Sequence, residues 1–181
     1  MYSGKNPTAL QSQTWICDAL LALLAIKPYH KITIKEITDT CQLSRQTFYQ
    51  LFDAKEEILE CRLNQLLDRY YQQFLVQHST ITSVELSSFY VRFSLENKVL
   101  IQQLIDNHLT QLLLTAYKLY IQKMKLKLMD ETTSIDFIAY KATFVAYGLV
   151  GIISQWFTEQ DLTEEELQQL VIQLIDEQFP V

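Results

Sequence analysis

Apolar residues recur every three or four positions along most of this chain, and that spacing is the period of an α-helix. Between residues 8 and 26, Leu10, Cys17, Leu20, Leu21 and Leu24 repeat in this way. The run KITIK at residues 31–35 alternates like a strand, but it is too short to outweigh its helical surroundings. Further helices are predicted from residues 33 and 44 and at residues 53–74, 84–95, 97–107, 108–129, 134–157 and 163–179. The pattern predicts an all-α protein.

Polar residues mark the starts of several of these helices. Thr33 with Glu36, and Thr163 with Glu166, have the spacing of a capping box, in which a hydroxyl and a carboxylate each bind a backbone N–H of the first turn. Asp53 stands where it can cap the next helix, with the acid three residues later reaching back. These positions predict where three helices begin.

The composition agrees with a helical globular protein. The 181 residues are 49% hydrophobic and 20% charged, with three Gly and three Pro. So few turn-forming residues argue against a β-fold, which needs many turns. The polar stretch QHSTITS, residues 77–83, is the best candidate boundary between two parts of the chain.

The sequence gives little support for an enzyme, a metal site or a membrane protein. Cys17, Cys41 and Cys61 lie in apolar patterns without C-x-x-C spacing, which indicates buried thiols in a cytoplasmic protein. His78 and His108 have no partners at metal-ligand spacing, and no phosphate loop or nucleophile elbow is present. The N-terminus lacks the apolar core of a signal peptide. The apolar stretch 139–157 contains polar interruptions, which favour a buried helix over a membrane span. We expect no cofactor.

A net charge of −6 at first argues against nucleic acid as a partner. The charge is unevenly distributed, however. Residues 1–62 hold seven basic and seven acidic side chains, whereas residues 63–181 hold eight and fourteen. Between residues 27 and 55 there are five basic and three acidic side chains. The acidity belongs to the second part, so the first part remains compatible with DNA.

The run SRQTFYQLF, residues 44–52, combines a packing pattern with a polar one. If Phe48 and Phe52 face inward, one turn apart, the 100° step of a helix places Gln46, Tyr49 and Gln50 outward. Together with the helix that starts at residue 33, this run predicts a helix-turn-helix unit. The periodicity alone fits an ordinary amphipathic helix equally well.

The side chains on the outer face suit contact with double-stranded DNA. In a recognition helix, Arg45 is placed to pair with guanine O6 and N7, and Gln46 with adenine N6 and N7. Hydroxyls suit phosphates or a thymine edge, and the starts of the flanking helices suit phosphates. The predicted DNA-binding set is Thr33, Ser44, Arg45, Gln46, Thr47, Tyr49, Gln50 and Lys55.

The order of residues in LSRQTFYQLFDAKEEIL, residues 43–59, resembles the signature of TetR/AcrR-type transcriptional regulators. The positions in register are Ser44, Arg45, Thr47, Phe48, Tyr49, Phe52, Lys55 and Glu56. The resemblance covers about residues 8–62. Gln42 stands in the turn where that family often has Gly. A Gln there must accept the turn backbone, with φ above zero, at a cost of roughly 1 kcal/mol.

The resemblance implies a homodimeric regulator with three DNA-binding helices in residues 1–53 and a helical ligand-binding and dimerisation domain in residues 54–181. A repressor of this kind reads a palindromic operator and is released by a small-molecule effector of unknown identity. The helix from Asp53 to about Phe74 joins both parts and is the expected lever. The effector acts by shifting the population between two spacings of the DNA-binding heads.

Two sets of residues in the second part follow from this picture. Small and apolar residues of the last two helices predict the dimer interface, with packing inside the chain as the alternative. The interface set is Gly148, Gly151, Ile153, Trp156, Leu167, Leu170 and Leu174.

Aromatic residues between positions 84 and 129 either line a ligand pocket or form ordinary core. The pocket set is Phe89, Tyr90, Phe93, Tyr117 and Tyr120. A co-regulator of the same fold that acts through a protein partner is the alternative function.

Overall fold

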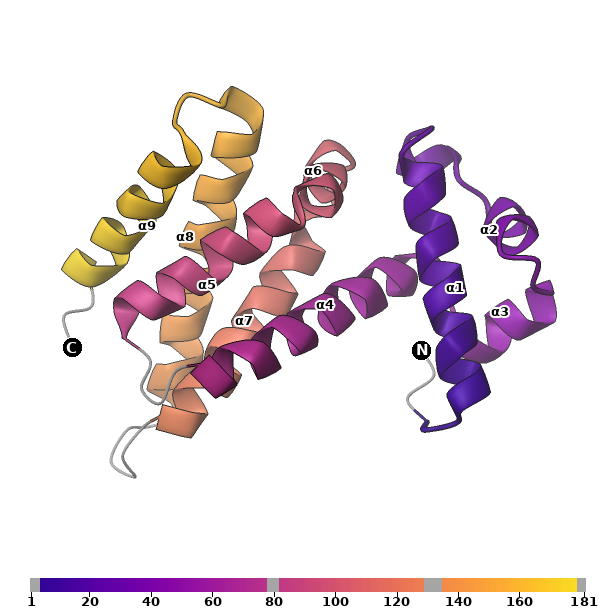
Figure 1. Ribbon diagram of the computed structural model, residues 1–181, viewed down its shortest axis with the longest axis horizontal. Coiled ribbons are helices and arrows are strands. Elements are labelled where there is room, and N and C mark those ends of the chain that lie inside the picture. The colour runs from indigo at the N-terminus through magenta and orange to yellow at the C-terminus, as the bar shows by residue number, and fades with distance from the viewer. Residues whose placement is uncertain (1–3, 78–81, 129–134, 179–181) are drawn as a thin grey trace. The chain divides into compact units, whose positions relative to one another are not determined.

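In the computed structural model, residues 4–77, 82–128 and 135–178 are described, and within them every regular element is helical. The all-α prediction is therefore confirmed. The predicted boundary at residues 77–83 and the start of the helix predicted at residue 134 lie largely or wholly outside these ranges. In order along the chain (Figure 1), the helices are α1 Pro7–Leu24, η1 Tyr29–Lys31, α2 Ile34–Thr40, α3 Arg45–Leu51, α4 Glu56–Gln77, α5 Ser83–Glu96, α6 Lys98–Asp106, α7 Thr110–Leu128, α8 Ile135–Glu159 and α9 Glu164–Gln178.

The chain packs as two units, residues 1–66 and residues 67–181. Helix α4 contributes to both, because the division falls inside it after Leu66. The functional division predicted after residue 53 lies just before this helix and stays a prediction. Each unit is described separately below.

The first unit is a three-helix cluster of α1, α2 and α3, each packed against the other two, together with the start of α4. Its core is formed by fully buried apolar side chains that the helical period places on inner faces. Ile16 and Leu20 come from α1, Ile37 from α2, Phe48 from α3 and Ile58 from α4. Removing these side chains from water supplies most of the free energy that holds the three short helices together.

Local capping fixes where the helices of the first unit begin. Asn6 accepts a hydrogen bond from the Thr8 N–H at 3.0 Å, and Pro7 occupies the first helical position of α1. The predicted capping box at the start of α2 is confirmed: the Glu36 N–H donates to Thr33 Oγ1 at 3.3 Å, and the Thr33 N–H donates to Glu36 Oε2 at 2.9 Å. Each cap satisfies backbone donors that a helix start leaves without a partner.

The turn between α2 and α3 has the backbone that the sequence required of it. Gln42 has φ of 55°, in the left-handed region that glycine adopts without strain. The Leu43 N–H then donates to the Thr38 carbonyl at 3.0 Å, which closes the end of α2. The chain accepts a strained Gln at this position to make the tight turn.

The start of α4 differs from the prediction. We expected Asp53 to begin this helix with the acid three residues later reaching back to it. Helix α4 begins instead at Glu56, and the Asp53 N–H donates to Glu57 Oε2 at 2.9 Å. The prediction was wrong by about one turn: Phe52 ends α3 in extended backbone, and residues 53–55 form bends and a turn before α4 begins.

In the second unit, α5 packs along α9 and α7 packs along α8, while α8 and α9 also contact each other. Figure 1 shows α8 and α9 as neighbours joined by a short turn. The capping box predicted at Thr163 is confirmed, since the Thr163 N–H donates to Glu166 Oε2 at 2.8 Å. The Trp156 indole N–H donates to the Leu162 carbonyl at 2.7 Å and secures the same turn.

Candidate nucleic-acid interface

Helix α3 has a polar side that faces outward and an apolar side that is packed into the first unit. Phe48 is fully buried, and its ring meets Tyr49 edge-on at a centroid distance of 5.3 Å and Phe52 at 5.9 Å. The predicted inward orientation of both Phe residues is therefore confirmed. Such aromatic contacts hold a seven-residue helix that has too few backbone hydrogen bonds to be stable alone.

The opposite face of α3 carries the side chains that were predicted to point outward. Arg45, Gln46, Tyr49 and Gln50 are all exposed, and the Tyr49 side chain is 57% exposed. Among the described residues, Arg45 has no ion-pair partner. We name this face, residues 45, 46, 49 and 50, the α3 polar face. Its guanidinium, amides and phenol are hydrogen-bonding groups that match base edges and phosphates.

Ser44 and Thr47 have a structural role that the sequence reading did not separate from DNA contact. The Thr47 N–H donates to Ser44 Oγ at 2.9 Å, and the two hydroxyl oxygens are also 2.9 Å apart. Ser44 is therefore the N-cap of α3, and Thr47 is half-buried beside it. These contacts orient the first turn of the helix, from which Arg45 and Gln46 project.

The Lys55 ammonium is held by the loop around η1. Lys55 Nζ donates to the Tyr29 carbonyl at 2.9 Å and to the Ile32 carbonyl at 3.1 Å, and it lies 4.1 Å from the centroid of the Tyr29 ring. Two of its three donors are thus occupied by backbone oxygens. Lys55 therefore stabilises the segment that precedes α2. The phosphate contact predicted for Lys55 stays a prediction beside this structural role.

Thr33 is likewise engaged before any ligand arrives. Its hydroxyl and its backbone N–H both donate to Glu36 Oε2, each at 2.9 Å. Lys27, followed by the N–H and the hydroxyl of Thr33, stabilises the Glu36 carboxylate and lowers the pKa of Glu36 to about 2. The phosphate contact predicted for Thr33 therefore has to share these groups with the cap of α2.

The residues predicted to line a ligand pocket form a packed aromatic core in the second unit. Phe89, Tyr90, Phe93, Tyr117 and Tyr120 are all buried, and the Tyr90 and Tyr117 rings lie 4.5 Å apart between centroids. The Tyr90 hydroxyl donates to the Tyr117 carbonyl at 3.3 Å. Of the five, Phe89 is the residue that also lines a described cavity. The other four are buried in the core of the second unit, and a pocket formed by them stays a prediction.

Two residues predicted for the dimer interface lie inside the single chain. Ile153 and Leu167 are buried to 0% and 1% exposure, and Trp156 is half-buried through its bond to the α8–α9 turn. These positions pack the second unit, because the inner sides of α8 and α9 face each other and their neighbours. Ile153 and Leu167 are therefore core residues of the single chain, and their place in a dimer interface stays a prediction.

The other four residues predicted for the interface, apart from Trp156, are exposed. Those on α8 share one side of the helix with three exposed aromatic residues that the prediction did not include. Gly148 and Gly151 are exposed, and a Cβ on either would meet nothing within 4 Å, so packing inside the chain does not require glycine there. The same side of α8 carries Tyr140, Phe144 and Tyr147, which are 79%, 62% and 61% exposed. We name residues 140, 144, 147, 148 and 151 the α8 aromatic face. Leu170 and Leu174 on α9 are also exposed.

The sequence held a signal for the α8 aromatic face. Positions 140, 144, 147, 148 and 151 follow the i, i+4, i+7 spacing that places side chains on one side of a helix. This spacing did not identify the exposed side, because α8 is apolar nearly all round and its periodicity does not show which side the chain buries.

In residues 4–77, 82–128 and 135–178, no group of three or more His, Cys, Asp or Glu residues could hold a metal ion. None of the helices in these ranges combines the length and apolarity needed to cross a bilayer.

A three-helix unit with an exposed polar helix behind a tight turn is the arrangement of a helix-turn-helix DNA-binding domain. Residues 16–60 match the family model described as bacterial regulatory proteins, tetR family, and this match spans α3 and the turn before it. Residues 16–60 are therefore identified as a DNA-binding domain of the TetR type.

Several solved structures share this fold. The protein Lin0861 from Listeria innocua is 15% identical with a TM-score of 0.76, and the match covers 99% of this chain and 97% of that one. A TetR-family transcriptional regulator from Syntrophomonas wolfei is 16% identical with a TM-score of 0.64, covering 92% and 93%. The dihydroxyacetone kinase operon activator DhaS is 21% identical with a TM-score of 0.55, covering 92% and 94%. No curated protein matches the chain.

Proposed function

We propose that the protein is a homodimeric repressor that reads a palindromic operator with the α3 polar face. The observation that carries this proposal is the pairing of an exposed set of base-reading side chains with the buried Phe48 and Phe52 beneath them. A fixed backbone lets each side chain meet one base pair. In this arrangement Arg45 donates to guanine O6 and N7, and Gln46 pairs with adenine.

The other members of the predicted set position the helix. Tyr49 and Gln50 flank the base-reading pair on the same exposed face, where they can reach phosphate oxygens. Ser44 and Thr47 cap α3, and Thr33 and Lys55 hold the neighbouring segments. Loss of these residues would weaken binding on every DNA sequence, whereas loss of Arg45 or Gln46 would change which sequence is preferred.

The α8 aromatic face supports the homodimer. Three aromatic rings exposed on one side of a helix, beside two glycines that let another helix approach, form the kind of apolar patch that marks a protein interface. Leu170 and Leu174 of α9 are further exposed apolar side chains of the second unit. In a two-fold dimer the same face meets its copy, and the two recognition helices then address two half-sites of an operator.

Release by a small-molecule effector completes the proposal. Helix α4 is continuous from Glu56 to Gln77 and contributes residues to both units, so a change in the second unit has a covalent path to the first. An effector shifts the equilibrium only by binding one spacing of the heads better than another. Repression is our choice for the direction of control; DhaS, a structure of similar fold, is an activator, and likeness of fold does not fix that direction. A DNA-binding regulator of this kind would work in the cytoplasm.

The test is a gel-shift titration of wild type, Arg45→Ala and Arg69→Ala on the DNA upstream of the protein's own gene. Arg69 is an exposed arginine of α4 in the second unit and serves as the charge-matched control. Arg45→Ala should weaken specific binding by about 1–3 kcal/mol and relax the preference at one base position. Arg69→Ala should bind as wild type. Equal binding by all three proteins would remove Arg45 from the interface.

A further inference from the structure

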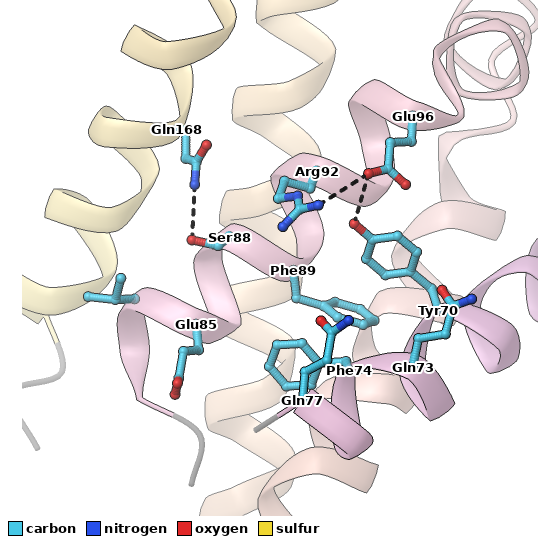
Figure 2. Close-up of a pocket in the computed structure, with 11 residues that line it drawn as sticks. Tyr70, Gln73, Phe74, Gln77, Glu85, Ser88, Phe89, Arg92, Glu96 and Gln168 are labelled. Atoms are coloured by element: carbon cyan, nitrogen blue, oxygen red, sulfur yellow. Dashed lines mark hydrogen bonds and ion pairs between the residues drawn. The ribbon is translucent and has the colours of Figure 1, made fainter. Parts of the chain in front are cut away.

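The second unit contains a cavity that is lined by one of the five residues predicted for a ligand pocket, Phe89. It has a volume of about 360 Å³ and lies within residues 70–168, between the C-terminal part of α4, one side of α5 and Gln168 of α9. Figure 2 shows side chains from these three helices around it. This volume falls at the small end of the range for ligand sites.

One wall of the cavity is aromatic and firmly packed. The Phe89 ring lies 5.1 Å from the rings of Tyr70 and Phe74, in both cases edge to face. Phe74 and Phe89 are buried in the protein core, so their rings are held in place before a ligand arrives. Edge-to-face rings offer apolar surface for the body of a small molecule.

The opposite edge carries hydrogen-bond donors. Ser88 Oγ accepts a hydrogen bond from Gln168 Nε2 at 3.1 Å, which leaves the Ser88 hydroxyl hydrogen to be donated elsewhere. Arg92 stands one turn further along α5, and its guanidinium has five N–H donors. Its nearest carboxylate oxygen, Glu96 Oε1, lies 3.6 Å away, which exceeds the length of a hydrogen bond.

The acidic groups of the cavity already have partners. Glu85 Oε2 accepts from the Thr82 N–H at 2.7 Å and from the Thr82 hydroxyl at 3.1 Å, as the capping box of α5. Glu96 Oε1 accepts from the Tyr70 hydroxyl at 3.4 Å, in addition to its pairing with Arg92. Burial, and then the charge of Glu96, raises the pKa of Tyr70 to about 12, so this hydroxyl stays a donor.

We propose that this cavity binds a small carboxylate with an apolar body. The apolar body lies against Phe74 and Phe89, and the carboxylate accepts from Arg92 and Ser88. Arg92 has donors to give because its pairing with Glu96 is long and 62% of its side chain is exposed. As the effector site of the regulator, the cavity rests on the function proposed above, but binding of the carboxylate itself does not.

The test compares three probes that share one body: 3-phenylpropanoate, 3-phenylpropanamide and 3-phenylpropylamine. Isothermal titration into the full-length protein should show the carboxylate binding about tenfold or more tightly than the amide, and the amine binding weakest. Arg92→Gln should remove the advantage of the carboxylate, and Arg92→Lys should retain part of it. Arg69→Gln, which changes an arginine away from the cavity, should bind like wild type.

Several results would overturn the proposal. They are a preference for the amine, equal affinity for acid and amide, or no binding of the carboxylate at millimolar concentration. Unchanged affinity in Arg92→Gln would do the same, provided that circular dichroism shows a wild-type melting curve. A gel shift without any probe separates this site from the proposed function: intact operator binding beside a failed titration refutes the cavity alone, whereas failed operator binding refutes the function.

Discussion

Helices α3 and α8 each leave one face exposed, and the two faces have opposite chemistry. The α3 polar face consists of a guanidinium, two amides and a phenol above a buried Phe48. The α8 aromatic face consists of three exposed rings and two glycines. A polar face is stable in water and becomes specific when it meets base edges, whereas an aromatic face of this extent gains free energy when it is covered.

The contrast shows that exposure alone does not identify a partner. On α3 the exposed groups are donors and acceptors with fixed directions, which is what sequence-specific reading of DNA needs. On α8 they are broad apolar surfaces, which suit the centre of a protein interface. We therefore propose nucleic acid as the partner of the α3 polar face and a second copy of the chain as the partner of the α8 aromatic face.

The largest effect on stability is expected when the buried ring of Phe48, beneath the α3 polar face, is removed. Phe48→Ala deletes a fully buried ring and should lower the free energy of unfolding of the first unit by about 3–5 kcal/mol. Its neighbour Tyr49 is exposed, so Tyr49→Ala should change stability by about 0.5 kcal/mol or less while weakening DNA binding. Urea denaturation followed by circular dichroism measures both. If the two variants lost similar amounts of unfolding free energy, α3 would not have a buried packing side and a separate exposed polar side.

The next effect concerns the α8 aromatic face. Phe144→Glu with Tyr147→Glu places two charges where the dimer would bury two rings, and dimer affinity should fall by at least about 2 kcal/mol, roughly thirtyfold. Val99→Glu, which alters an exposed apolar side chain on α6, is the control. Sedimentation velocity over a concentration series measures the association. If the double variant dimerises like wild type, the interface lies elsewhere.

A smaller effect is expected at the turn that aims α3. Gln42 has a positive φ, so Gln42→Gly should relieve strain and stabilise the first unit by about 1 kcal/mol. Gln46 lies inside α3, and Gln46→Gly should destabilise it by a similar amount. Thermal melts of the two variants should therefore move in opposite directions. A lower melting temperature for Gln42→Gly would mean that its side chain makes a contact that outweighs the strain.

The smallest effect is a dependence on pH at the start of α2. The pKa of Glu36 falls to about 2 in the folded protein, through the hydrogen bond from Lys27 and those from Thr33, against about 4.3 when unfolded. Its contribution to stability is complete above about pH 4.3 and is lost as the pH falls toward 2. The stability difference between wild type and Glu36→Gln should shrink across that window. A difference that stays constant from pH 6 to pH 2 would refute the assignment.

The fold and the α3 polar face were predictable because their signals are local. Capping boxes, the helical period and the order of residues around Phe48 all lie within about one or two turns of each other. Gln42 illustrates the strength of such signals, since its place in a tight turn predicted a positive φ that the structure has.

The sites of the second unit were harder to predict from the sequence, because they depend on contacts between residues that are far apart in the chain. Helix α8 is apolar nearly all round, so Gly148 and Ile153 looked alike in the sequence although one is exposed and the other is buried. Tyr90 and Tyr117 fit either a pocket or a core by composition, and their rings pack against each other in the folded chain. The cavity lined by Tyr70, Phe89 and Arg92 also joins Ser88 to Gln168, 80 positions apart, and the packing of α5 on α9 brings these two residues together.

The central claim, that the α3 polar face reads a DNA sequence, is tested most directly by selection from randomised DNA duplexes with wild type and Arg45→Ala in parallel. Wild type should enrich a palindrome whose half-sites lie about one helical turn apart, with a guanine that Arg45→Ala no longer selects. A wild-type pool without a shared motif, or an unchanged guanine preference in Arg45→Ala, would contradict the account.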